Sequence, residues 1–221
     1  MIVVVANTKG GVGKSTLAVH LAGWLHHHGQ SVVLADCDAQ RSSSEWLGDA
    51  VPGVTGVPLP GANEILNQLP KLAERATYVV ADGPGSNSEV SRALLLRADM
   101  AIVPCKASML EVRALASATE VLRQAQDIRG GLPEAHIVLS MVGSRHRLTR
   151  DMKEAAAALE LPLAPTPIVL RQAYADAPGQ KALVWDLGTR GREAASELDA
   201  LFRHLLPSVR KSTRAKPRGA A

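Results

Sequence analysis

A glycine-rich loop between an apolar run and a helix constrains this chain more than any other feature. Residues 2–6 are apolar throughout, and residues 9–16 follow as Lys-Gly-Gly-Val-Gly-Lys-Ser-Thr. Glycines let several backbone N–H groups turn toward one anion, and the N-terminus of the following helix adds the positive end of its dipole. In such a loop Lys14 reaches the β- and γ-phosphates, and the Ser15 hydroxyl ligates Mg²⁺. The segment therefore predicts a polyphosphate site.

The loop also carries a second lysine. The usual spacing places glycine six residues before the lysine, where this chain has Thr8, and Lys9 stands on the upstream side of the loop. Residues 9–15 resemble the KGGxGK[ST] loop of the ParA/MinD group of deviant Walker A ATPases. The resemblance implies a slow ATPase with Mg²⁺, stimulated by a partner protein. It also implies an ATP-dependent homodimer in which Lys9 acts on the partner's ATP. The residues expected to bind the nucleotide are Lys9, Gly10, Gly11, Val12, Gly13, Lys14, Ser15 and Thr16.

Apolar runs alternate with longer helical patterns along the chain. The runs expected to form strands are residues 2–6, 31–35, 78–81, 100–104, 136–142 and 165–169. One helix is expected between the loop and Gly29, and others over residues 65–75, 90–97, 110–126, 149–159 and 192–206, with a loop and perhaps a short edge strand over 51–63. Strands that are apolar throughout are buried on both faces, and alternation with helices favours parallel pairing. The fold class expected is α/β: a doubly wound, mainly parallel sheet of the P-loop NTPase type, with its ligand at the carboxyl ends of the strands.

Aspartates follow two of the expected strands. Asp36 and Asp38 lie on alternate residues before Gln40, and Asp82 precedes Gly83-Pro84-Gly85. A surface turn is the ordinary alternative, because aspartate is common there. An acidic residue at a strand tip also suits a metal-bound water, and glycines suit a mobile γ-phosphate switch. Residues 36–40 resemble the family's DxDxQ pattern. By that resemblance Asp38 positions the attacking water and acts in catalysis with Lys9 and Lys14, while Ser15, Asp36 and Asp82 serve the metal.

A downstream segment extends the resemblance. Residues 171–177 read Arg-Gln-Ala-Tyr-Ala-Asp-Ala, followed by Gly179 and by Val-Trp-Asp at 184–186. This is similar to the R-x-x-[YF]-x-[DE]-A…G…V pattern of small partition-type ATPases, in which the segment lies near the dimer face and the nucleotide. Many family members have Asp-Thr-Pro where this chain has Asp82-Gly83-Pro84, which puts only the fine switch contacts in doubt.

Composition indicates one domain and a basic tail. The chain has 221 residues, of which 46% are hydrophobic, enough for one core. We expect an ATPase domain over residues 1–206 and a disordered tail over 207–221, which holds five basic residues and no acid. Without those five residues the formal net charge of +4 would be −1. The N-terminal residues lack a signal-peptide pattern and no run is long enough to span a bilayer, so we expect a cytoplasmic protein.

The family resemblance suggests a role in moving DNA or another cargo. ParA-type proteins bind duplex DNA without sequence preference in the ATP state, which associates them with the nucleoid and serves plasmid or chromosome partition or cargo positioning. Lysine and arginine supply such binding by releasing counterions from the duplex. The candidates are Arg190, Arg192, Arg203, Arg210, Lys211 and Arg214. A merely solvated basic tail is the plain alternative for the last three.

Two other functions remain open from the sequence. A MinD-like membrane switch needs a C-terminal amphipathic helix with bulky apolar residues. After Leu206 this chain offers only Val209 as a large aliphatic residue, together with two prolines, so no membrane partner is expected. The other alternative is a metabolic ATP-dependent enzyme of the same fold.

Overall fold

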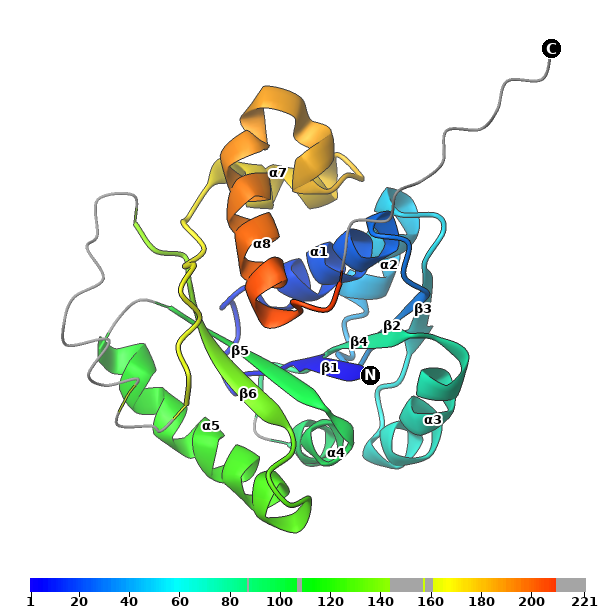
Figure 1. Cartoon of the computed structure of the whole chain (residues 1–221), viewed down its shortest axis with the longest axis vertical. Coiled ribbons are helices and arrows are strands. Elements are labelled where there is room, and N and C mark those ends of the chain that lie inside the picture. The colour runs from blue at the N-terminus through cyan, green and yellow to red at the C-terminus, as the bar shows by residue number, and fades with distance from the viewer. Residues whose placement is uncertain (87, 107–108, 144–156, 158–160, 210–221) are drawn as a thin grey trace.

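A parallel β-sheet forms the centre of the molecule (Figure 1). The computed structural model describes residues 1–86, 88–106, 109–143, 157 and 161–209, without the side chains of residues 109–114 and 116–118. The described residues form six strands: β1 (Ile2–Val5), β2 (Val32–Asp36), β3 (Thr55–Pro58), β4 (Tyr78–Asp82), β5 (Met100–Lys106) and β6 (Glu134–Ser140). All neighbouring strands pair in parallel, in the order β3-β2-β4-β1-β5-β6. Because the chain leaves the central β1 and returns on both sides of it, the sheet is doubly wound.

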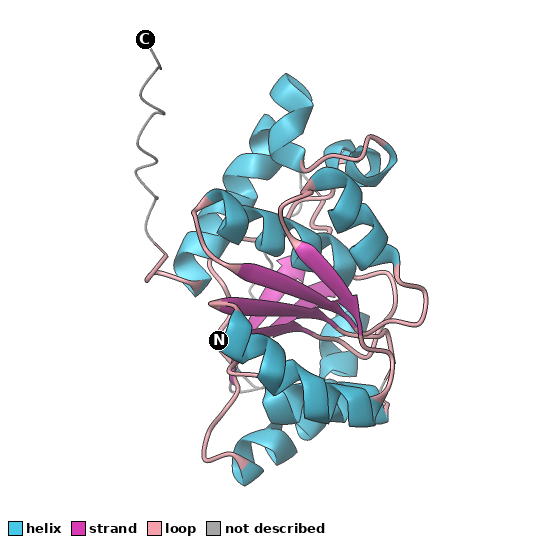
Figure 2. Ribbon diagram, turned by 90° about the vertical axis from the view of Figure 1, so that its right-hand side faces the viewer, coloured by secondary structure: helices cyan, strands magenta, loops and turns pink. Residues whose placement is uncertain are grey.

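Helices cover both faces of the sheet (Figure 2). One layer contains α1 (Lys14–His27), α2 (Ser42–Ala50), α7 (Gln172–Gly179), the 3-10 segment η1 (Val184–Arg190) and α8 (Arg192–Leu205). The other layer contains α3 (Ala62–Arg75), α4 (Glu89–Arg97) and α5 (Met109–Ile128). The phosphate loop lies between β1 and α1, at the carboxyl edge of the sheet.

Strand β1 shows why apolar runs in this sequence become strands. All four of its residues are buried. Val3 and Val5 belong to the apolar cluster that includes α1, while Ile2 and Val4 belong to the cluster formed with α3 and α4. Alternate residues of a strand point to opposite faces, so a strand covered on both sides must be apolar throughout. The doubly wound α/β class predicted from the sequence is confirmed.

The short edge strand allowed within residues 51–63 is present as β3. The strand expected over residues 165–169 is wrong. Only Val169 makes an isolated bridge, to Val142, although the amides of Ile168 and Leu170 donate to β6 and the residues after it. Pro165 and Pro167 have no amide hydrogen, so the segment cannot build a continuous ladder.

Two helices in the layer of α1 were not expected from the sequence. These are α2 and α7. The helix predicted over residues 149–159 falls almost wholly outside the described residues. At the C-terminus, Val209 is 6% exposed and belongs to the cluster that includes α8. Packing therefore reaches Val209, three residues beyond the boundary expected at 206, and residues 210–221 lie outside the described part.

Candidate nucleotide site

Two polar side chains that were not predicted from the sequence, those of Asn7 and Ser140, hold the phosphate loop in place. The Asn7 amide donates from Nδ2 to the Pro104 carbonyl over 2.6 Å, and its Oδ1 accepts from the Lys9 amide over 3.0 Å. The Ser140 hydroxyl donates to the buried Val12 carbonyl over 2.8 Å. Asn7 and Ser140 therefore fix the loop to the ends of β5 and β6, where only the fold brings them together.

Glycines shape the top of the loop. Gly11 has a φ of +65° and Gly13, which caps α1, has a φ of +90°. Both values lie in the left-handed region, which glycine adopts without steric cost. No side chain in the described part of the protein caps α1, so its first amide groups remain available to an anion at the helix N-terminus.

Lys14 lies inside the loop. Its side chain is almost buried, and Nζ donates to the Lys9 carbonyl over 2.8 Å. Burial lowers the pKa of Lys14, while the nearby carboxylates of Asp82 and Asp38 act to raise it. An ammonium has three donors, so the bond to Lys9 leaves others for a phosphate oxygen.

The two strand-end aspartates Asp36 and Asp82 are neighbours in the register of β2 and β4, and both are fully buried. Their hydrogen bonding differs. Asp36 accepts the amide of Asp38 over 3.2 Å and the amide of Ser44 over 2.8 Å. The second bond caps the first turn of α2, so Asp36 holds the chain as it turns from β2 into that helix.

Asp82, by contrast, has no hydrogen bond of ordinary geometry to either carboxylate oxygen within the described residues. Burial raises the pKa of Asp82 to about 6, and Asp36 adds to the rise. The hydroxyls of Ser15 and Ser43 and the Lys14 ammonium lie close enough to lower it in part. A buried carboxylate without a partner is costly, and a divalent cation beside the Ser15 hydroxyl would satisfy it. The residues present therefore fit a Mg²⁺ ion.

An open cleft of about 790 Å³ lies above these residues. This volume is within the range typical of small-ligand sites, roughly 300–1,000 Å³. Of the predicted site residues, Asp38 enters the lining together with most of the phosphate loop, whereas Lys9, Val12, Asp36 and Asp82 do not. The lining residues from the expected site are Gly10, Gly11, Gly13, Lys14, Ser15, Thr16 and Asp38.

The segment after β4 touches the phosphate loop directly. A β-carbon placed at Gly85 would stand 3.1 Å from the Gly10 α-carbon and 3.4 Å from Lys14 Nζ. One placed at Gly83 would stand 3.1 Å from the Val5 carbonyl oxygen. A side chain at either position would make a tight contact with the loop or with β1, so these two glycines let the segment pack closely against them.

Comparison with known proteins identifies the family. The model of the CobQ/CobB/MinD/ParA nucleotide-binding domain matches residues 3–184. The chain belongs to this family. Its resemblance to the ParA/MinD ATPases, first indicated by the loop, is confirmed.

Individual ParA/MinD-family relatives cover nearly all of the chain. Maintenance of carboxysome distribution protein A from Halothiobacillus neapolitanus is 27% identical over 92% of this chain and 95% of its own. Chromosome partitioning protein ParA from Caulobacter vibrioides is 28% identical over 89% and 91%. Among solved structures, an aspartate-to-alanine variant of McdA from Cyanothece in complex with ATP matches with a TM-score of 0.78 and 18% identity, over 96% of this chain and 98% of that one. The last match supports the fold.

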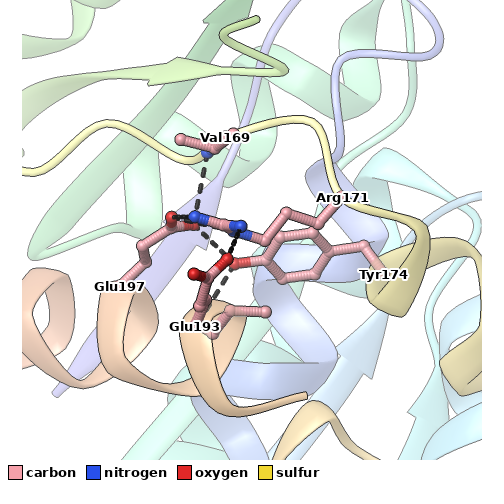
Figure 3. Close-up of polar contacts among 6 residues, drawn as sticks. Val169, Arg171, Tyr174, Glu193 and Glu197 are labelled. Atoms are coloured by element: carbon pink, nitrogen blue, oxygen red, sulfur yellow. Dashed lines mark hydrogen bonds and ion pairs between the residues drawn. The ribbon is translucent and has the colours of Figure 1, made fainter. Parts of the chain in front are cut away.

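The family-like segment after residue 170 is anchored to α8 (Figure 3). The Arg171 guanidinium donates to Glu197 from Nε over 2.9 Å and from a terminal nitrogen over 2.6 Å, and it also contacts Glu193. The Tyr174 hydroxyl donates to the Ala194 carbonyl over 3.2 Å, and the Val169 amide donates to Glu197 over 3.3 Å.

This anchored segment and the phosphate loop line opposite sides of a small cavity. The cavity has a volume of about 60 Å³ and is lined mainly by apolar groups. Its walls include Gly13, Thr16 and Leu17 from the loop side, and Val169, Leu170 and Tyr174 from the anchored segment.

Three of the residues predicted to bind DNA are arginines on η1 and α8, and none of the three lines the cleft. Arg190, Arg192 and Arg203 are exposed. Arg192 and Arg203 are about three helical turns apart on α8 and therefore share a face. Arg210, Lys211 and Arg214 lie outside the described residues. No helix in the part of the chain that the structure describes is long and apolar enough to cross a membrane.

Proposed function

We propose that this protein is a ParA-type switch that binds ATP and Mg²⁺, forms a homodimer around the nucleotide and hydrolyses ATP slowly. The observation that carries the proposal is the different placement of the two loop lysines. Lys14 is buried and bonded to its own loop. Lys9 is exposed, and the hydrogen bonds found for it among the described residues involve only its backbone. Its ammonium is therefore available to ATP held by a second copy.

The other site residues of one copy bind the phosphates and the metal and orient water. The loop amides and Lys14 hold the phosphates, and Ser15 and Asp82 hold Mg²⁺, with Asp36 supporting them from the adjacent strand. The metal, when bound, neutralises charge on the phosphate oxygens. Asp38 accepts the Gln40 amide through Oδ1 over 3.0 Å and lines the cleft, where it orients the attacking water. We propose that basal ATP hydrolysis is slow, because a switch must hold its ATP state, and that a partner protein accelerates it.

The proposal includes non-specific binding of duplex DNA in the ATP state. Arg192 and Arg203 share the exposed face of α8, and Arg190 lies directly before that helix. A dimer presents two such faces to one duplex, to which the basic tail adds charge. The relatives' names point to partition of a chromosome or plasmid, or positioning of a protein cargo, by a cytoplasmic, nucleoid-associated protein. A membrane anchor is disfavoured because Val209 packs into the core.

Filter binding to duplexes of unrelated sequence tests the DNA step. With ATP, the wild-type protein should bind all duplexes alike. If the dimer neutralises four phosphates, log K should fall against log salt with a slope of roughly −3.6. The double substitution Arg192→Gln and Arg203→Gln should flatten this slope, while Arg75→Gln, at the end of α3 in the other helical layer, should leave it unchanged. Binding to liposomes in place of DNA, or equal DNA binding with ADP, would contradict the proposal.

A further inference from the structure

Lys106 occupies a place beside the phosphate loop that the proposed mechanism does not use. It is the last residue of β5, which pairs directly with β1. The loop that follows β1 therefore has β4, with Asp82, on one side and β5, with Lys106, on the other. In the β5–β6 register Lys106 is opposite Ser140, whose hydroxyl holds the Val12 carbonyl of the loop. The backbone of Lys106 is thus fixed relative to the loop.

The side chain of Lys106 points at the loop. Its Nζ lies 4.0 Å from the position that a β-carbon would take at Gly11, and Gly11 itself is exposed. Within the described residues, no hydrogen bond or ion pair involves this ammonium; the one side-chain group found bonded to Lys106, the Cys105 thiol, donates to its carbonyl oxygen. An unneutralised cation therefore stands beside a loop of bare glycines, across that loop from the acidic residues of β2 and β4.

We infer that Lys106 is a third cation of the nucleotide site, acting with Lys14 of the same copy, and with Lys9 of the second copy in the ATP dimer, on the di- or triphosphate of a bound nucleotide. The inference rests on the proposed nucleotide site and deepens it. The charge of Lys106 raises the positive potential at the loop from the β5 side. That potential attracts a nucleotide more strongly when the nucleotide carries more negative phosphate charge. Lys106 should therefore favour ATP and ADP over AMP and slow the release of the first two.

Equilibrium titration with fluorescent ATP, ADP and AMP tests this assignment at constant Mg²⁺. We expect Lys106→Gln to bind ATP and ADP about tenfold more weakly than the wild type and AMP nearly as well. Lys106→Arg keeps the charge and should restore the affinity. Lys71→Gln on α3 makes the same charge change at an exposed site in the other helical layer and should match the wild type. Raising the salt from about 0.05 M to about 0.5 M screens the charge of Lys106 and should therefore narrow the difference in ATP affinity between Lys106→Gln and Lys71→Gln.

Two results would overturn the role of Lys106 while leaving the nucleotide site intact. One is equal ATP affinity in Lys106→Gln and Lys71→Gln. The other is an equal loss for ATP and AMP together with a lower melting temperature, which would mean that Lys106 only supports the fold. Failure of the wild-type protein to bind ATP is a different outcome, since it would remove the proposed function itself.

Discussion

A buried histidine joins the end of the phosphate loop to η1, and its titration gives a quantitative prediction. His20 on α1 is completely buried. Its Nε2 is 3.1 Å from the Val184 amide and its Nδ1 is 2.7 Å from the Thr16 carbonyl oxygen. An amide can only donate and a carbonyl can only accept, so the ring is neutral with its proton on Nδ1. The rings of Trp46, at 5.2 Å, and Trp185, at 5.6 Å, leave it no contact with water.

This environment lowers the pKa of His20 from 6.5 to about 4, and burial is the main cause. Between those values the unfolded chain binds a proton that the folded protein does not. Stability is therefore fully present above pH 6.5 and is lost as the pH falls toward 4. Integrating the linkage relation gives a loss of about 2 kcal/mol between pH 7 and pH 5 from this residue alone.

The substitution His20→Asn removes the titrating group. Urea unfolding of both proteins at pH 7, 6 and 5, followed by tryptophan fluorescence, measures the effect. At pH 7 the variant should be less stable, because it loses ring contacts. The stability advantage of the wild type should shrink by about 2 kcal/mol by pH 5, since all other titrating groups are common to both proteins. A difference that does not change with pH would refute the neutral, doubly bonded state of His20.

Three further substitutions test the site. Asp82→Asn should stabilise the metal-free protein at pH 7 by up to about 3 kcal/mol. Burial raises the pKa of Asp82 from 3.8 to about 6, so ionising this carboxyl costs more in the folded protein than in the unfolded chain. The wild type therefore loses stability as the pH rises from 3.8 through about 6 and regains it as the pH falls. Equal urea midpoints for the two proteins would contradict this. Asp38→Ala should retain ATP binding and lose most hydrolysis, because a water-orienting group acts in the transition state; phosphate release near the wild-type rate would count against it. Arg171→Met should lower the free energy of unfolding by about 2 kcal/mol by leaving the Glu197 carboxylate without its charged partner, and unchanged thermal melting would show that the pair adds nothing.

The central strands could be predicted from the sequence because each is an apolar run buried on both faces. Helix α2 could not. It begins with three serines, which are weak helix formers, and its first turn depends on a cap from Asp36, a residue of the preceding strand. The prediction of a strand at residues 165–169 was wrong for a local reason. The segment is largely apolar, but its two prolines lack the amide hydrogens that a continuous ladder needs.

The position of the candidate site could be predicted more completely than its support. Lys14 and Ser15 follow from the loop motif and Asp38 from the family resemblance, and the structure brings the three to one cleft; their catalytic roles stay predictions. The support given by Asn7 and Ser140 joins residues about a hundred positions apart, which spacing cannot reveal. Nor does a sequence pattern distinguish Asp36, which accepts two backbone amides, from Asp82, which accepts none among the described residues.

The molecular mass of the protein in solution, measured by light scattering with Mg²⁺ and either ATP or ADP, tests the proposed switch most directly. The wild type should double its mass with ATP and remain a monomer with ADP. Lys9→Ala should bind ATP but stay monomeric, because the exposed lysine is the group available to the second copy, whereas Lys71→Ala on α3 should behave as the wild type does. An unchanged ATP-dependent dimer in Lys9→Ala, or no dimer in the wild type, would contradict the account.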